Sequence, residues 1–363
     1  MEKTNSNNYL SNIKSKYIVI NIFDILLKKK SFEIIKYNKT LQNKIDIDIN
    51  TYKEYSTTEI EINLAKNIYG NFINMTEKKE PYFHIYFNNS RKEMKKYYIN
   101  DKDKIKKIKI LIYKKKIKTK GLFQDCKCIE SISIKSYRSI FNDMKYLFNN
   151  CTSLKRIEFI HINTENTYDM SGMFNHCISL EEIIFSDFKT EKVTSMNDMF
   201  SGCTSLKSLN LSTFNTENVK DMSCMFNYCQ SLKELNISSF NTRNVESMSA
   251  LFCNCELLTS LNLSNFHTEN VTCMDSMFHN CYSLKELNIS NFNIENVEYM
   301  VYMFSGCKSL INVNISNFII KENTKVRGMF KKCSRIIENK IRALNEYLKD
   351  EDFMEEEEMI FNY

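Results

Sequence analysis

Residues 225–245 read Met-Phe-Asn-Tyr-Cys-Gln-Ser-Leu-Lys-Glu-Leu-Asn-Ile-Ser-Ser-Phe-Asn-Thr-Arg-Asn-Val, and the chain repeats this stretch every 26 residues. Its phenylalanine recurs at Phe148, Phe174, Phe200, Phe226, Phe252, Phe278, Phe304 and Phe330. A cysteine follows three positions after each, at Cys151, Cys177, Cys203, Cys229, Cys255, Cys281, Cys307 and Cys333, and one further copy, Phe123 with Cys126, precedes them. A fixed period of this length is typical of a solenoid built from stacked units.

Each unit divides into two halves with different spacing. Leu232, Leu235 and Ile237 have the spacing of leucine-rich repeats, and the alternation around Asn236 predicts a short strand. The apolar residues that follow fall on one face of a helix: Val245, Met248, Leu251, Phe252 and Cys255. Thr242 or Asn244 could cap the start of that helix. The expected fold is therefore α/β: a leucine-rich-repeat solenoid with a parallel β-sheet on one side and short helices on the other.

The period also divides the chain into three parts. Residues 1–104 lack it and predict a small α+β region, helical over 15–45 and extended at 58–63 and 82–87. The solenoid is expected over 105–335, beginning with an edge strand at 105–110. Residues 336–363 predict a capping helix, from Ile336 to Leu348, and then an acidic tail. A cap is expected because the open end of a solenoid would expose its core.

The 13 cysteines predict free, buried thiols rather than disulfides. Nine of them occupy the repeat position, and their spacing follows the 26-residue period. A buried cysteine behaves as a small hydrophobic residue. The pairs Cys126/Cys128 and Cys253/Cys255 lack a second pair at the spacing of a zinc site, so no metal or other cofactor is expected.

The candidate binding surface is the outward face of the predicted sheet. Uniform rows of asparagine and serine would lie beside a variable row, which would supply specificity. The predicted partner-binding residues are Arg156, Glu182, Asn210, Ser212, Glu234, Asn236, Ser238, Asn262, Ser264, Glu286, Asn288, Ser290 and Asn314. A second interpretation is that the amides in these rows bond only to one another and keep this side soluble.

The blocks Met-Phe-x-x-Cys-x-Ser-Leu at 225–232 and Phe-Asn-Thr-x-Asn-Val at 240–245 closely resemble the BspA-type leucine-rich repeat, over about residues 121–333. That resemblance implies an interaction solenoid, which in some relatives is a surface adhesin. The segment Ile22-Phe23-Asp-Ile-Leu26, followed by Asn38-Lys39-Thr-Leu41, resembles an F-box without its leading Leu-Pro or its Trp. That second resemblance would imply a ubiquitin-ligase adaptor that docks an Skp1-type subunit.

Catalytic motifs are absent from the sequence: it contains no His-x-x-x-His, no Gly-x-Ser-x-Gly and no glycine-rich phosphate loop. We therefore expect a non-catalytic scaffold that binds a protein partner and no small-molecule substrate. The ten lysines of residues 101–120 lack interleaved aromatics, so they do not favour a nucleic acid or a membrane as partner.

The expected compartment is the cytoplasm, with the cell surface as the alternative. Five strand asparagines each begin an Asn-x-Ser glycosylation sequon: Asn210, Asn236, Asn262, Asn288 and Asn314. On adjacent strands these sites would be too close for a glycan on each. Free thiols also favour a reducing compartment.

Overall fold

The computed structural model describes residues 57–75, 82–113, 116–136, 140–186, 188–315 and 318–334, with a few single positions outside these ranges. The strands of the described residues are β1 (Thr58–Leu64), β2 (Gly70–Asn71), β3 (Phe83–Phe87), β4 (Glu93–Met94), β5 (Tyr98–Ile99), β6 (Lys107–Ile112), β7 (Lys116–Ile117), β8 (Ile129–Ser136), β9 (Ile140–Phe141), β10 (Arg156–Ile160), β11 (Glu182–Phe185), β12 (Ser208–Asn210), β13 (Glu234–Asn236), β14 (Glu286–Asn288) and β15 (Asn312–Asn314).

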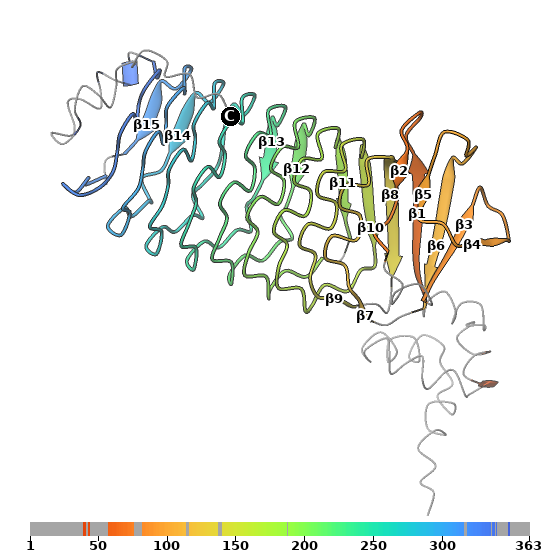
Figure 1. The fold of residues 1–363 in the computed structure, drawn as a ribbon. Helices are drawn as coiled ribbons and strands as arrows, with labels where there is room; N and C mark the ends of the chain where they lie inside the picture. The colour runs from red at the N-terminus through yellow and green to blue at the C-terminus, as the bar shows by residue number, and fades with distance from the viewer. Residues whose placement is uncertain are drawn as a thin grey trace, which may run out of the picture.

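The strands of successive repeats lie parallel along one side of an elongated solenoid (Figure 1). Arg156 pairs with Glu182, Ser208 with Glu234, and Glu286 with Asn312, so each partner lies one 26-residue repeat away. This confirms the predicted solenoid and its parallel strands. Equivalent side chains of successive coils therefore form columns along the molecule.

The N-terminal strands continue the same sheet, but they run antiparallel. The seven-stranded sheet has the order β11-β10-β8-β1-β6-β3-β4, with β1 between β8 and β6. β1 and β3 confirm the strands predicted at 58–63 and 82–87. β6 also confirms a strand in the segment 105–110, but its predicted place at the edge is wrong, because β6 lies inside the sheet and pairs with both β1 and β3.

The pairing of β1 with β6 follows from their sequences. Ile60 and Ile62 of β1 are buried and lie opposite Ile110 and Ile108 of β6. On the outward side, Lys109 Nζ lies 2.5 Å from Glu59 Oε1. β1 therefore supplies both an apolar face for the core and acidic groups for the basic strand, which the repeat pattern could not reveal.

The short helices predicted opposite the sheet are wrong. Between residues 57 and 334 the described residues contain no α-helix, and the second half of each coil is a series of turns. Two residues in each coil have positive φ, four positions apart, for example Ala250 at 52° and Asn254 at 58°. A left-handed residue cannot continue a right-handed helix. Thr242 consequently does not cap a helix: its Oγ1 accepts the N–H of His267 in the next coil.

Backbone hydrogen bonds explain why turns replace the helix. The N–H groups of Met248, Ala250, Phe252 and Asn254 donate to carbonyls of the next coil at 2.7–3.0 Å. Between them, the N–H groups of Leu251 and Cys253 bond three residues back in their own coil, to Met248 and Ala250. Because alternate N–H groups are used between coils, no residue is left to form the i to i−4 bonds of an α-helix. The turns still point an apolar residue inward every three or four positions, which imitates helical spacing.

The core consists of columns of identical side chains. The rings of Phe226 and Phe252 stack with centroids 5.6 Å apart and planes 4° apart, and the same stacking links the column from Phe123 to Phe330. The predicted free cysteines are confirmed, and the repeat cysteines are buried except for Cys333 in the last coil, which is half-buried. The predicted capping helix is not supported, since almost all of residues 336–348 lie outside the described residues, as do most of residues 15–45.

Candidate partner-binding face

The predicted binding residues lie together on the outward side of the strands, which we call the sheet face. All are exposed except Ser290, which is half-buried. Asn210 pairs in register with Asn236, and Asn288 with Asn314, so the asparagines form one row. The structure thus brings the sequence-predicted residues onto one surface.

The asparagines of this row end the strands. Asn210, Asn236, Asn262 and Asn288 each accept, through Oδ1, the backbone N–H of the residue two positions later, at 3.0–3.2 Å. This Asx-turn uses only the amide oxygen of each asparagine, and the Nδ2 group takes no part in it. In the described part of the chain, none of these four Nδ2 groups donates a hydrogen bond to protein, so the amides do not bond to one another.

Charges on the sheet face differ between its two ends. Arg156 binds Glu182 with Nη1 and Oε2 2.5 Å apart, and Lys155 binds Glu130 at 2.8 Å. That hydrogen bond raises the pKa of Lys155 above its usual value. Further along, Glu234 and Glu286 form no ion pair with any described residue. The strands β13 and β14 therefore carry exposed carboxylates that form no ion pair with the described residues.

Register adds residues that the sequence analysis missed. Glu158 pairs with Ser133 and with Ile184, which places all three in the column of the asparagines. On the antiparallel side the column continues through Glu61 and Lys109. The 26-residue period locates Glu158 and Ile184, but Glu61 and Lys109 carry no repeat signal.

One coil interrupts the strand pairing. Among the described coils between β10 and β15, residues 259–263 are the ones that have no assigned strand, although Asn262 and Ser264 keep their exposed positions. The bond from Lys285 N–H to Thr259 O is 3.5 Å, longer than the equivalent 2.8 Å bond from Lys233 to Lys207.

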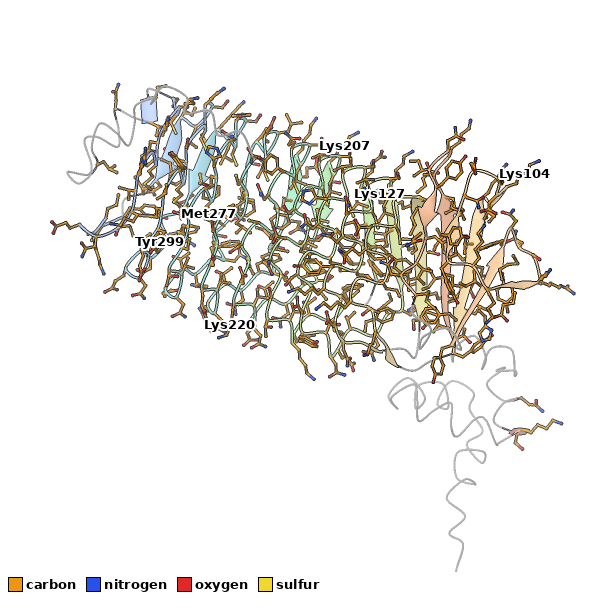
Figure 2. All side chains as sticks on the ribbon, in the orientation of Figure 1. Lys104, Lys127, Lys207, Lys220, Met277 and Tyr299 are labelled. Atoms are coloured by element: carbon orange, nitrogen blue, oxygen red, sulfur yellow. The ribbon has the colours of Figure 1, made fainter. Side chains whose placement is uncertain are left out.

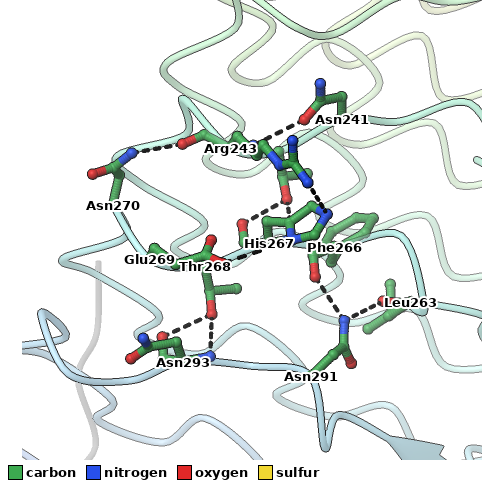
Figure 3. A network of polar contacts seen from close by, with 11 residues as sticks. Asn241, Arg243, Leu263, Phe266, His267, Thr268, Glu269, Asn270, Asn291 and Asn293 are labelled. Atoms are coloured by element: carbon green, nitrogen blue, oxygen red, sulfur yellow. Dashed lines mark hydrogen bonds and ion pairs between the residues drawn. The ribbon is translucent and has the colours of Figure 1, made fainter.

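Figure 2 shows Lys220 on the opposite side of the solenoid from Lys207. The loop that leads to Lys220, residues 213–220, and the equivalent loops of the following coils form what we call the loop edge. Its polar groups are held in hydrogen bonds between coils (Figure 3). Thr268 Oγ1 donates to Asn293 O at 2.7 Å, and Asn270 Nδ2 donates to Arg243 O at 2.7 Å. Asn291 Nδ2 donates to Phe266 O at 2.6 Å. These amides support the backbone of the neighbouring coil, unlike those of the sheet face.

The chemistry available on the sheet face is hydrogen bonding and charge pairing. Among the described residues no cluster of histidine, cysteine, aspartate or glutamate is arranged to hold a metal ion. In the same part of the chain, no helix combines the length and the hydrophobicity of a membrane span.

Comparison with known families identifies the repeats. Residues 78–196 match the family described as BspA type leucine rich repeat region, six copies. Residues 142–256 and 229–343 match a family described as Mycoplasma protein of unknown function, DUF285, and these two matches together span more than half of the chain. Neither match includes the F-box-like segment. No curated protein matches the chain.

Proposed function

The chain belongs to the BspA-type leucine-rich-repeat proteins, and from this we propose that it is a non-catalytic scaffold that binds a protein partner through the sheet face. The observation that carries the proposal is the row of Nδ2 groups on Asn210, Asn236, Asn262 and Asn288. These donors are exposed and unused by the described protein, whereas the asparagines of the loop edge are used between coils. A partner with backbone or carboxylate acceptors would satisfy them.

Free carboxylates beside the amide row support the same proposal. Glu234 and Glu286 lie in the variable row, two residues before Asn236 and Asn288 on the same face of their strands. Mixed donors and acceptors on a surface that stacked coils hold rigid give specificity with little ordering cost. Repeats of this kind are generally non-enzymatic, in agreement with a binding role.

The test compares two charge-reversed variants of the full chain. Glu234→Lys with Glu286→Lys changes the sheet face, while Glu217→Lys with Glu269→Lys makes the same charge change on the loop edge. Affinity capture with mass spectrometry identifies proteins retained by the unmodified chain. We expect the first variant to capture at least tenfold less of the principal partner than the unmodified chain does. The second variant should capture the same amount as the unmodified chain. Equal retention by both variants would exclude the sheet face as the binding surface.

We further propose a cytoplasmic location, supported by the free thiols and by the sequons stacked on neighbouring strands. Treatment of the cellular protein with an N-glycosidase should leave its electrophoretic mobility unchanged, and surface proteolysis of intact cells should leave it intact. Cleavage from intact cells would favour the adhesin alternative. The F-box alternative concerns residues 15–45 and is tested by the retention of an Skp1-type subunit.

A further inference from the structure

The antiparallel strands near the N-terminus carry aromatic side chains on the outward side of the sheet. Side chains alternate along a strand, so the neighbours of the buried Phe83 and Ile112 point outward. Tyr113 N–H donates to Tyr82 O at 3.3 Å, and the two side chains are 54% and 40% exposed. The other outward residues beside them are half-buried. We call this surface the aromatic face, and it comprises Tyr82, His84, Tyr86, Leu111 and Tyr113.

Strand pairing gives the lysines of β6 the aromatic neighbours that they lack in the sequence. Lys109 lies opposite Tyr86, and Leu111 lies opposite His84. The rings of His84 and Tyr113 meet edge to face, with centroids 5.1 Å apart. Aromatic side chains beside cations on a sheet are typical of surfaces that bind single-stranded nucleic acid, because the rings receive bases and the cations bind phosphates.

A cluster of cations borders the aromatic face. Asn88, directly after β3, donates from Nδ2 to Lys104 O at 2.8 Å, and its Oδ1 accepts the N–H of Lys106 at 2.8 Å. These bonds hold the turn after β3 against the segment that leads into β6. Lys104 lies at the end of the solenoid that carries these strands (Figure 2). The turn and the segment carry five exposed cations, which we call the basic corner: Arg91, Lys92, Lys104, Lys106 and Lys107.

The carboxylates beside the aromatic face already have cationic partners. Glu93 Oε1 lies 3.1 Å from Lys95 Nζ. Lys109 Nζ lies 2.5 Å from Glu59 Oε1 and 3.9 Å from Glu61 Oε1. In contrast, no cation of the basic corner forms an ion pair with a described residue. The corner therefore keeps positive charge that an external anion can neutralise.

The form of these surfaces favours a nucleic acid over an anionic membrane. Residues 88–92 of the basic corner read Asn-Asn-Ser-Arg-Lys and offer no apolar side chain for insertion among lipids. The exposed rings instead lie on neighbouring strands, where Tyr82 and Tyr113 are close enough to receive neighbouring bases of one nucleic-acid strand. A duplex keeps its bases stacked inside, so the expected ligand is single-stranded.

We propose that the aromatic face and the basic corner together bind a single-stranded nucleic acid. Bases stack on Tyr82 and Tyr113, and phosphates pair with the basic corner, including Lys104 and Lys107. Because every base has a flat aromatic surface, this mode tolerates many sequences. The inference goes beyond the function proposed above and does not depend on it, since it uses other strands. The variant Glu234→Lys/Glu286→Lys should therefore bind nucleic acid as the unmodified chain does.

Fluorescence anisotropy of a short labelled oligouridine, titrated with the full chain, tests the stacking. Tyr82→Ala/Tyr113→Ala should weaken binding by about tenfold or more at every salt concentration. Tyr82→Phe/Tyr113→Phe keeps both rings and should bind as tightly as the unmodified chain. The matched control is Tyr228→Ala/Tyr299→Ala, at two exposed tyrosines of the coils, which should leave the affinity unchanged.

The salt dependence of binding tests the basic corner. Lys104→Gln/Lys107→Gln removes two phosphate contacts, so the slope of log affinity against log salt concentration should become shallower by about 1.4. Lys207→Gln/Lys233→Gln makes the same charge change at exposed lysines of the coils and should leave the slope as it is.

Three results would overturn the proposal. The first is an affinity for oligouridine that is the same in the unmodified chain and in the tyrosine and lysine variants. The second is a duplex bound as tightly as the single strand, because a duplex does not offer its bases to the tyrosines. The third is no binding of oligouridine together with binding to vesicles that contain phosphatidylserine, because the basic corner would then serve a membrane.

Discussion

The repeat cysteines connect neighbouring coils through their thiols. Cys229 Sγ donates to Phe200 O at 3.2 Å, and the same contact occurs at 3.0–3.3 Å in every coil from Cys151 to Cys333. Thiols are weak donors, so each bond contributes little by itself. Cysteine fits because it fills a small buried space and donates a second hydrogen bond to a carbonyl that already accepts a backbone N–H, as Phe200 O does from Cys203.

Burial of these thiols predicts a loss of stability at high pH. Burial raises the pKa of Cys177 and of Cys229 to about 12, against about 8.5 for an unperturbed thiol. Above pH ~8.5 the unfolded chain releases these protons and the folded chain keeps them, so the free energy of unfolding falls as pH rises towards 12. Each thiol contributes about 1.4 kcal/mol per pH unit in that window.

Urea unfolding between pH 8 and pH 10.5 measures this slope. Cys229→Ala should make it shallower by about 1.4 kcal/mol per pH unit at the alkaline end. The difference between the two proteins isolates one thiol from the lysines and tyrosines that titrate in both. An unchanged slope in Cys229→Ala would contradict the assignment of the pH dependence to buried thiols.

Two glycines in the column of left-handed residues accommodate tyrosine rings of the preceding coil. A Cβ on Gly172 would lie 2.5 Å from the Tyr146 ring, and one on Gly328 would meet Tyr302. Other coils carry side chains at this position, for example Asp198, so the left-handed backbone alone does not demand glycine. The large residue in one coil requires the small one in the next.

Gly172→Ala should therefore lower the free energy of unfolding by more than the ~1–2 kcal/mol that an alanine costs in a left-handed backbone conformation. In Tyr146→Ala/Gly172→Ala the ring is absent, and the added cost of the alanine should fall to that backbone term. Chemical denaturation of the four proteins of this double-mutant cycle gives the coupling. A coupling near zero would show that the Tyr146 ring moves aside without cost.

At the scale of the element, each coil is held to the next by buried threonines. Thr190, Thr216, Thr242 and Thr268 each donate to one carbonyl of the next coil and accept one of its N–H groups, at 2.7–2.9 Å. Ile294 and Ile320 take this position in later coils. In the loop, the hydroxyl thus supplies the two bonds between coils that backbone N–H and C=O groups would supply in a sheet.

Thr242→Val keeps the shape of the side chain but leaves the His267 N–H and C=O without this partner. We expect a loss of about 1–3 kcal/mol, the cost of an unsatisfied buried group. The control is Thr272→Val, at an exposed threonine whose Oγ1 donates to Glu246 O at 3.2 Å, with an expected change within about 0.5 kcal/mol. Urea midpoints measure both, and equal losses would show that Thr242 has no special role.

Some of these elements could be predicted from the sequence and others could not. Period and column identity predict the parallel strands, the buried phenylalanines and the exposed asparagine row. The helix prediction fails because spacing reports which residues point inward and not where their N–H groups bond. The antiparallel β1 has no repeat signal, so its place between β8 and β6 depends on contacts such as Lys109 with Glu59. The unused Nδ2 groups of the face are visible only once the Asx-turns are known.

At the scale of the whole molecule, the solenoid is a one-dimensional stack. Each described coil contacts its neighbours through the phenylalanine, cysteine and threonine columns, and these columns repeat without a change of register. Stability is then a sum of coil and interface terms. The register of the coils therefore matters more for folding than their order, whereas in the proposed binding role the order of the variable residues would set what the sheet face binds.

Deletion of one full repeat should therefore preserve the fold. Removal of residues 247–272 joins Glu246 to Cys273. Phe226 then stacks on Phe278, and Thr242 meets Asn293 as its hydrogen-bond partner in place of His267, so every column stays in register. We expect a cooperative urea transition with an m-value lower by about 7%, in proportion to the surface lost.

Removal of residues 247–259 deletes half a repeat and sets Phe226 beside a residue that is not phenylalanine. Because that change breaks the core columns beyond the junction, this shorter deletion should unfold the chain, and circular dichroism should show the loss of its β signal. If the half-repeat deletion folded as well as the full one, register would not be what holds the coils together.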